Sequence, residues 1–233
     1  MQHTFRFSVI LLLLTAGRTT LNAEELTEAE QAEGYESLFD GESLAGWTGA
    51  LEGYVVEDGA ITCDQERGGN LFTEQEFSDF ILRCEFRLPP GGNNGIGLRV
   101  PEGGHASYDG MEIQVLDNTA DKYAKLKPYQ YHGSVYGIIP AKRGYLKEVG
   151  AWNTQEIRCI GRRVTVILNG EVIVDGNLDE ATENGPLDGK EHPGAHRETG
   201  HIVLCGHGSR VQFRNMRILD LSDQSDSQAT AAE

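Results

Sequence analysis

The feature that most constrains the fold of this chain is a series of short runs in which apolar and polar residues alternate, separated by glycine, asparagine and aspartate. A two-residue period places successive side chains on opposite faces of a strand, and the separating residues favour turns. No ten-residue stretch of the core shows a helical period. The clearest runs are Tyr54–Val56, Phe80–Leu88, Gly95–Val100, Met111–Leu116, Glu156–Ile160, Val164–Leu168, Glu171–Val174, His201–Cys205 and Val211–Ile218.

The turns indicate how these strands are joined. Asn169-Gly170, between Leu168 and Glu171, is the pair that best accepts the positive φ angles of a type I′ hairpin. The chain also has 29 glycines against 7 prolines, as expected for many tight turns. So many short antiparallel strands predict an all-β fold, a two-sheet antiparallel jelly-roll sandwich forming a single domain over residues 35–221.

The two ends of the sequence differ from this pattern. Residues 1–23 carry a basic start, an unbroken apolar run Val9–Leu14 and small residues before Ala23, which is typical of a secretory signal. Cleavage is expected after Ala23, with Ala16 as the alternative. Residues 24–34 form an acidic lead-in with weak helical character, and residues 222–233 are expected to be disordered. The signal predicts export to the periplasm or the extracellular space.

The charge of the chain excludes two classes of partner. It has 20 Lys and Arg against 36 Asp and Glu, a formal charge of −16. Removal of the signal would take away Arg6 and Arg18 and no acid, leaving 18 basic against 36 acidic residues and a charge of −18. Such a surface repels phosphate backbones and anionic lipids, so we expect no nucleic acid and, after signal removal, no membrane as partner.

The four cysteines, Cys63, Cys84, Cys159 and Cys205, are widely spaced and fit no zinc motif. Export permits disulfides, but each cysteine lies in an apolar strand-like run. We therefore expect buried free thiols, with disulfides as the alternative.

Alternation assigns faces to two adjacent runs. If Ile96, Leu98 and Val100 face the core, Arg99 points outward, and in the next run Glu112 and Gln114 point outward likewise. A curved jelly-roll sheet presents such a face as a groove, which makes Arg99, Glu112 and Gln114 candidate site residues. The alternative is a solvated cross-strand salt bridge of little energetic weight.

Further polar residues could join this groove. His132, Ser134 and Tyr136 share a face if their segment is extended, and glycines flank them. His207 lies between two glycines at the end of a predicted strand. His192, His196 and His201 fit no metal-binding spacing and are interpreted as loop residues.

A set of short motifs occurs in order from about Tyr35 to Leu221. They are Ser37-Leu38-Phe39-Asp40-Gly41, Gly46-Trp47, Val56-Glu57-Asp58-Gly59, Asn93-Asn94-Gly95-Ile96-Gly97-Leu98-Arg99, Gly110-Met111-Glu112-Ile113-Gln114-Val115-Leu116-Asp117, Gly133-Ser134-Val135-Tyr136, Trp152-Asn153, Leu168-Asn169-Gly170, Gly206-His207-Gly208 and Val211-Gln212-Phe213-Arg214-Asn215-Met216. In these motifs the chain resembles the 3-keto-disaccharide hydrolase domain family. The resemblance implies a concanavalin-like jelly roll, a carbohydrate substrate and cleavage of glycosidic bonds in sugars oxidised at carbon 3.

The chemistry that the resemblance implies can be stated physically. A ketone at carbon 3 acidifies the hydrogen on carbon 2, because the resulting carbanion is delocalised as an enolate. A base can then remove that proton, and the group on carbon 1 is expelled by elimination, with or without later addition of water. The site needs a base, a stabiliser of the enolate oxygen and an acid, rather than the paired carboxylates of ordinary glycosidases.

Roles follow from the resemblance. His132 is expected to act as base or acid with Tyr136 as its proton-transfer partner, and Arg99 to stabilise the enolate. Glu112 and Gln114 would orient sugar hydroxyls, or Glu112 would hold a divalent cation (calcium, magnesium or manganese) together with His207. The residues expected to contact substrate are Asn93, Asn94, Gln114, Asp117 and His207.

Two other functions fit the same sequence. One is a non-catalytic carbohydrate-binding module, since one fold serves several functions; it predicts binding of unoxidised oligosaccharide without turnover. The other is an interaction protein of the cell envelope, which predicts a flat apolar patch in place of a polar groove.

Overall fold

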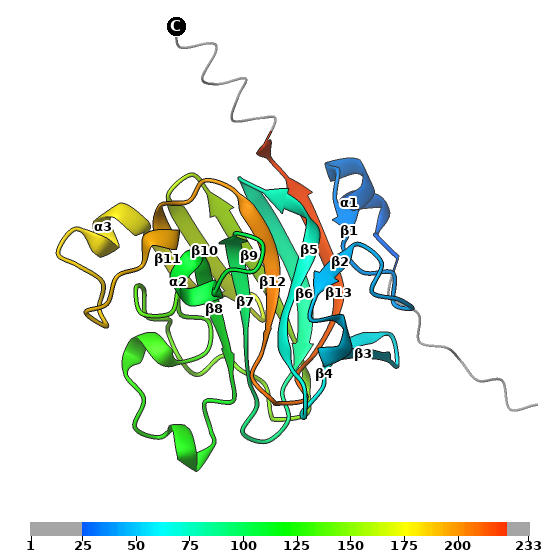
Figure 1. The fold of residues 1–233 in the computed structure, drawn as a ribbon, viewed down its shortest axis with the longest axis horizontal. Coiled ribbons are helices and arrows are strands. Elements are labelled where there is room, and N and C mark those ends of the chain that lie inside the picture. Colours follow the sequence, from blue (N-terminus) through cyan, green and yellow to red (C-terminus); the bar gives the residue numbers. More distant parts are fainter. Residues whose placement is uncertain (1–24, 223–233) are drawn as a thin grey trace, which may run out of the picture.

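Two antiparallel sheets packed face to face make up most of the computed structural model, which describes residues 25–222 (Figure 1). The predicted signal, and all of the predicted tail except Ser222, lie outside the described residues. The strands are β1 (Glu36–Ser37), β2 (Trp47–Gly49), β3 (Tyr54–Glu57), β4 (Ala60–Cys63), β5 (Gly69–Phe77), β6 (Phe80–Arg87), β7 (Asn93–Val100), β8 (Met111–Leu116), β9 (Trp152–Ile160), β10 (Arg163–Leu168), β11 (Glu171–Asn177), β12 (Gly200–Gly206) and β13 (Gln212–Asp220).

One sheet has eight strands in the order β11-β10-β9-β6-β13-β4-β3, with β1 paired to β13. The other has five, in the order β2-β5-β12-β7-β8. Neighbours in both sheets are far apart in sequence, as in β6 beside β13 and β7 beside β12, which is typical of a jelly roll. The predicted all-β, two-sheet fold is confirmed.

Each of the nine predicted runs overlaps a strand, and the hairpin is also confirmed. Leu168 pairs with Glu171, while Asn169 and Gly170 have φ angles of +51° and +91°. The longest missed strand is β5, whose exposed half Glu74-Gln75-Glu76 has no alternation to reveal it. It matters to the fold because it joins β2 to β12.

The helices are short, in agreement with the absence of a helical period in the core. They are α1 (Glu28–Glu33), α2 (Ala106–Asp109), α3 (Leu178–Thr182) and four 3-10 turns, Leu51–Gly53, Asp121–Tyr123, Pro128–Gln130 and Pro193–His196. None of the helices in the described residues is long and apolar enough to cross a membrane. The acidic lead-in contains α1, whose Glu30 pairs with Arg217 and Arg83 of the eight-stranded sheet.

The main core fills the space between the sheets, with aromatic residues such as Phe80, Phe86 and Phe213 fully buried. A second apolar cluster consists of Phe72, Val100, Ala106, Val203 and Cys205. Because Ala106 begins α2, this cluster fixes that helix against β7 and β12. All four cysteines are buried and free, as predicted.

Candidate functional site

The site begins at the pairing of β7 with β8. Gly97 is opposite Glu112 and Gly95 is opposite Gln114, so these four residues share one face of the five-stranded sheet. The apolar residues between them, such as Ile96 and Ile113, enter the core. The prediction that Glu112 and Gln114 lie together on the face away from the core is therefore confirmed.

A pocket of about 430 Å³ lies over this face. It is within the range of ligand sites and has several convergent polar groups. Its lining residues are Asn93, His105, Ser107, Glu112, Gln114, Leu116, Tyr123, Leu126, Gln130, Tyr136, Lys190 and His207. Five of the predicted site residues are thus brought together: Asn93, Glu112, Gln114, Tyr136 and His207.

Glu112 and His207 form the ionisable pair of the pocket. The Glu112 side chain is 7% exposed and the His207 side chain 44%, and Oε1 of Glu112 lies 3.7 Å from Nε2 of His207. The carboxylate raises the pKa of His207 above its usual value, although partial burial opposes this shift. The pair can therefore hold and transfer a proton near neutral pH.

Glycine at position 95 makes room for the carboxylate. A Cβ atom there would lie 2.1 Å from Oε1 of Glu112, far inside van der Waals contact. At position 97 a Cβ would meet the side chains of Val100, Val203 and Ala106. Gly95 therefore lets the Glu112 side chain lie over β7, whereas Gly97 leaves room for the second apolar cluster.

Amide groups continue the polar face beyond Glu112. Gln114 Nε2 donates to Asn93 Oδ1 at 2.7 Å and to the Asn94 carbonyl at 3.3 Å. The Asn93 oxygen is thereby occupied, so its N–H groups remain to face a ligand. Elsewhere in the lining, Gln130 Nε2 donates to the Tyr136 hydroxyl at 3.0 Å and orients it.

Tyr136 reaches the pocket because its segment covers the open edge of β8. Gln114 N–H donates to the Ser134 carbonyl, Gly133 N–H to the Gln114 carbonyl and Tyr136 N–H to the Glu112 carbonyl. Val135 forms a bridge with Ile113 and enters the core. These contacts attach Tyr136 to the strand that carries Glu112.

Arg99 lies outside the pocket, which corrects the prediction that it joins Glu112. Its guanidinium is buried and donates to the carbonyls of Ser78, Gly161 and Arg197 and to the Asp79 carboxylate.

The cause of this difference is an irregularity in β7. Arg99 has φ +52°, and the register of β7 against β12 shifts so that Val203 faces Gly97 while His201 faces Val100. The β-bulge inserts one extra residue and reverses the alternation. Val100 consequently packs in the outer cluster under α2, and Arg99 is turned away from the groove.

His132 is also absent from the pocket. Its ring is 1% exposed and packs against Phe86, with ring centroids 4.9 Å apart, and Nδ1 accepts from the Leu116 N–H. Burial lowers the pKa of His132 to about 3, so the imidazole is neutral at ordinary pH. The left-handed φ of Gly133, +81°, breaks the extended geometry that would have aligned His132 with Tyr136.

Two further predicted substrate contacts belong to the interior. Asn94 is fully buried and accepts from the Gly95 N–H. Asp117 is 3% exposed. Although burial opposes its ionisation, hydrogen bonds from Thr119 and the Gly91 N–H lower the pKa of Asp117. Both residues support the strand ends beside the pocket and do not line it.

Glu112 and His207 are the residues of the pocket that were expected to hold a divalent cation. Glu112 and His207 are adjacent, but the part of the chain that the structure describes contains no group of three or more His, Cys, Asp or Glu placed to hold an ion. Calcium takes six to eight oxygen ligands, far more than this pair supplies, and magnesium prefers carboxylate and water oxygens to an imidazole. Glu112 and His207 fit a proton-transfer pair better than a metal site, and the mechanism proposed for this chain uses no metal.

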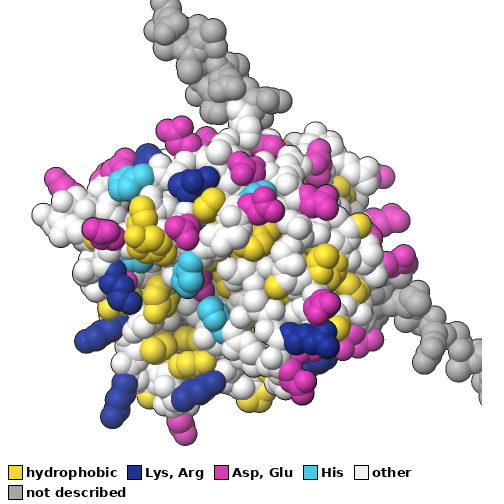
Figure 2. All heavy atoms as spheres, in the orientation of Figure 1, with side chains coloured by type: hydrophobic (Ala, Val, Ile, Leu, Met, Phe, Trp, Pro, Cys, Tyr) yellow, Lys and Arg dark blue, Asp and Glu magenta, His cyan; other side chains and the backbone are white. Residues whose placement is uncertain are grey.

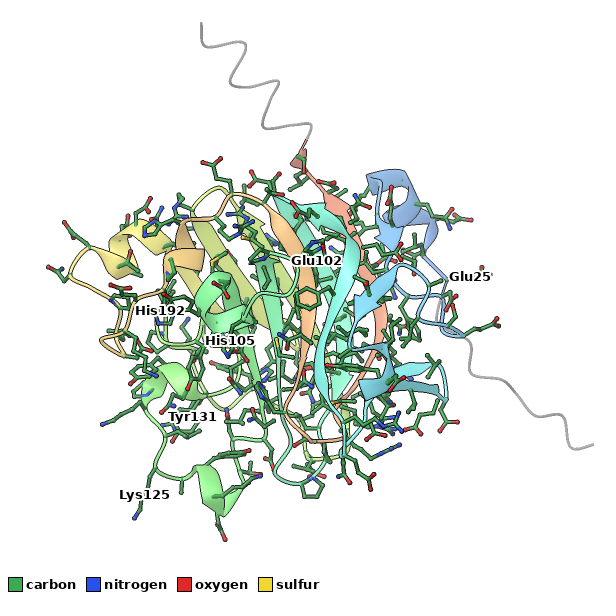
Figure 3. The ribbon with its side chains drawn as sticks, in the orientation of Figure 1. Glu25, Glu102, His105, Lys125, Tyr131 and His192 are labelled. Carbon is green, nitrogen blue, oxygen red and sulfur yellow. The ribbon has the colours of Figure 1, made fainter. Side chains whose placement is uncertain are left out.

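The residues that close the pocket on the α2 side were not among those predicted from the sequence; they are His105, Ser107 and Lys190. Figure 2 shows histidine side chains gathered on this face, and Figure 3 shows that His105 and His192 lie over the α2 end of the sheet. His105 and Ser107 belong to the glycine-rich stretch before Tyr108, and Lys190 to a loop more than 80 positions later. The only feature of the sequence that could have indicated these lining residues was the presence of histidine in two glycine-rich loops.

The chain is similar to several known proteins. It is 26% identical over 242 residues to a 3-keto-disaccharide hydrolase of Bacteroides thetaiotaomicron, covering 85% of this chain and 83% of that protein. A provisionally assigned glycosyl hydrolase of Parabacteroides distasonis superposes with a TM-score of 0.74 at 25% identity, covering 86% of this chain and 100% of that one. A second provisionally assigned glycosyl hydrolase from the same organism superposes with a TM-score of 0.71 at 26% identity, covering 80% of this chain and 99% of that one.

The family match spans almost all of the described residues. The model of the 3-keto-alpha-glucoside-1,2-lyase-like domain matches residues 34–219, a range that includes both sheets except Asp220 at the end of β13, and every residue of the pocket. The family resemblance seen in the sequence motifs is therefore confirmed. This chain belongs to the 3-keto-alpha-glucoside-1,2-lyase-like domain family.

Proposed function

We propose that this chain is an exported carbohydrate-active enzyme that cleaves glycosidic bonds of 3-keto-glycosides, including 3-keto-disaccharides, by removal of the C2 proton and elimination. The observation that carries the proposal is the Glu112–His207 pair, which lies in a pocket lined by several hydroxyl, amide and aromatic groups together with His105, Lys190 and two leucines. The family and the similarity to a 3-keto-disaccharide hydrolase support the substrate class.

His207 is the proposed base, in place of the buried His132. The neutral imidazole takes the proton from carbon 2 on its other nitrogen, the one that does not face Glu112, and the electrons of that C–H bond pass into the enolate of the C3 ketone. The negative Glu112 carboxylate stabilises the imidazolium that forms. The buried position of Glu112 strengthens this interaction, because water screens it less.

Elimination also requires a hydrogen-bond donor to the enolate oxygen and an acid that protonates the leaving group. Asn93 lines the pocket, and its N–H groups are proposed to stabilise the enolate oxygen, the role expected of Arg99. The enolate then re-forms the ketone as the C1–O bond breaks, leaving a double bond between carbons 1 and 2. The Tyr136 hydroxyl is proposed to protonate the departing oxygen, with Gln130 holding it in place. Water added to the double bond would give net hydrolysis.

Incubation of the protein without residues 1–23 with 3-keto-trehalose and 3-keto-sucrose, beside the unoxidised sugars, tests the proposal. Release of the leaving sugar from the keto substrates alone is the expected result. Binding of unoxidised sugar without release from any keto substrate would favour a carbohydrate-binding module. The same assay with and without a chelator tests the divalent cation, and release is expected to persist.

Variants at the pair sharpen this test. Glu112→Gln and His207→Asn should each reduce the rate by about 10²–10⁴-fold. Glu171→Gln in β11 and His196→Asn are matched controls, because both residues are exposed and lie outside the pocket. If Glu112→Gln or His207→Asn cleaves the keto substrates at the wild-type rate, the role assigned to that residue is wrong, although the proposed activity stands.

Export is the proposed compartment because residues 1–23 carry the signal pattern. Expression of the full chain in a bacterial host, followed by fractionation and mass measurement, should yield a periplasmic or secreted protein beginning at Glu24. A cytoplasmic, uncleaved product would contradict this assignment.

A further inference from the structure

A second hollow opens directly beside the pocket that holds Glu112 and His207. It has a volume of about 470 Å³ and is lined by His105, Ser107, Tyr108, Tyr136, Asp188, Lys190, Glu191 and His192. Four of these residues, His105, Ser107, Tyr136 and Lys190, line both hollows. We call the pocket with Glu112 the inner lobe and its neighbour the outer lobe. The shared residues make them two parts of one groove.

The walls of the outer lobe are tied together by His192. Its Nδ1 lies 2.8 Å from the Ser107 carbonyl at α2, and its Nε2 lies 3.1 Å from Oδ1 of Asp188. The Asp188 N–H donates to the Gly137 carbonyl, next to Tyr136. The buried His192 imidazole and the Asp188 backbone thus join three segments that are distant in sequence, at Ser107, at Gly137 and at residues 188–192.

Close backbone contacts indicate that this wall is preformed. A Cβ at Gly137, which has φ +77°, would lie 2.6 Å from Nε2 of His192. A Cβ at Gly194, in the turn after His192, would lie 2.1 Å from the backbone nitrogen of Gly110 at the end of α2. These close contacts leave little room for the loop around His192 to shift. The outer lobe therefore loses little conformational entropy when a ligand binds.

The two lobes differ in their chemistry. Glu112 and His207 line the inner lobe only, so the ring that loses its proton must lie there. The outer lobe has no part of this pair, but it has the ring of Tyr108, which is 47% exposed. Beside it are the exposed charged groups of Lys190 and Glu191, which can bond to hydroxyls.

We propose that the outer lobe is the subsite for the leaving group, a second hydroxylated sugar ring that stacks on Tyr108, with Lys190 and Glu191 beside its hydroxyls. This inference rests on the proposed function, because it takes the reacting ring to occupy the inner lobe. An aromatic face with polar groups at its edge matches a sugar ring, which has apolar C–H faces and a polar rim. Tyr108 is then a specificity-determining residue that acts on the leaving group.

The test compares Tyr108→Ala on two substrates that share the keto ring. 3-Keto-trehalose has a second sugar ring, and methyl 3-keto-α-glucoside has a methyl group in its place. Loss of the stacking contact should raise KM about 3- to 10-fold for the disaccharide and by less than twofold for the methyl glycoside. Tyr145→Ala, which removes an exposed tyrosine outside both lobes, should change neither KM. An equal effect of Tyr108→Ala on both substrates, or none on either, would overturn the assignment.

A binding measurement separates this inference from the proposed activity. Calorimetry or saturation-transfer NMR with unoxidised trehalose and methyl α-glucoside requires no turnover. If no keto substrate is cleaved, the proposed function fails, yet a selective loss of trehalose binding in Tyr108→Ala still supports the outer lobe as a sugar subsite. Wild-type protein that binds trehalose no better than methyl α-glucoside would refute the subsite.

Discussion

Glu112 Oε1 and His207 Nε2 lie 3.7 Å apart, the carboxylate buried against the pocket face of β7 and the imidazole partly exposed at the pocket. The separation is that of an ion pair and exceeds a direct hydrogen bond. One partner is thus shielded from water while the other remains in reach of a ligand. This unequal burial suits a base whose protonated form must be stabilised while its reacting nitrogen stays accessible.

Glu112→Gln should change the pH dependence as well as the rate. The carboxylate raises the pKa of His207, so its removal should lower that pKa. A base works in its neutral form, and the rate should therefore rise with pH through the His207 pKa in the wild type. In the variant the residual rate should rise at a lower pH. NMR titration of the His207 ring and pH–rate profiles provide the measurement, and coincident midpoints would refute the coupling.

Gly95→Ala should disturb the same pair from the neighbouring strand. The new methyl group would lie 2.1 Å from Oε1 of Glu112, so the carboxylate must move. We expect kcat/KM to fall at least about tenfold, since small displacements of a positioned group are costly, and the His207 pKa to fall as well. Unfolding free energy should drop by about 1–3 kcal/mol.

Gly176→Ala in β11 is the matched control for this change. Its Cβ would also contact a neighbour closely, at 3.0 Å from Ile139 Cδ1, but it lies in the other sheet. It should affect stability and leave the His207 pKa unaltered. If both alanine variants lower activity equally, the space above Gly95 has no special role.

Half of the site could be predicted from the sequence because strand alternation is local. Glu112 and Gln114 point outward since β8 is regular along its length. The predicted positions of Arg99 and His132 were wrong because the backbone is irregular there. Arg99 itself has a left-handed φ angle, and His132 precedes Gly133, which also has one. Alternation of apolar and polar residues has a period of two, and it cannot show where one extra residue in a β-bulge moves the following side chains to the other face of the strand.

The outer lobe was beyond prediction for a different reason. Ser107, Asp188 and His192 approach one another only because the Pro193–His196 turn packs against the end of α2. No spacing rule relates these loops, which are about 80 positions apart. The strand runs were sufficient for the fold class, whereas the loops that complete the groove required tertiary structure.

Arg99→Met should test whether this buried guanidinium is structural. Its removal takes away the charged partner of Asp79, which keeps only the Gly161 N–H as donor, and a donor from each of three backbone carbonyls. Breaking a buried pair in this way costs about 3–5 kcal/mol of unfolding free energy. Denaturant unfolding should show that loss, while kcat of the folded protein at low temperature should stay within about twofold of wild type. A large fall in kcat at full stability would return Arg99 to the catalytic machinery.

The cysteines should react only after unfolding. All four are buried and free, and burial raises the pKa of Cys84 to about 12 and that of Cys159 to about 11, which disfavours the reactive thiolate. A thiol reagent should therefore label none of them in the native protein at pH 8 and four in guanidinium chloride without reductant. Fewer than four labels in the unfolded chain would indicate a disulfide.

His132 should make the protein less stable in mild acid. Burial lowers the pKa of His132 to about 3 in the folded state, whereas an unfolded histidine titrates near its ordinary value of about 6.5. The unfolded chain therefore binds more protons between these two values. The contribution of His132 to stability is complete above about pH 6.5 and declines as pH falls, by about 2 kcal/mol at pH 5.

His132→Leu isolates this effect, because leucine has no proton to bind. The variant loses the hydrogen bond to the Leu116 N–H and should be less stable at pH 7. The difference in unfolding free energy between wild type and variant should then shrink by about 2 kcal/mol on going to pH 5. Activity of the folded variant should survive, since His132 lies outside the pocket. A constant difference across this range would show that His132 titrates normally in the folded protein, contrary to its burial against Phe86.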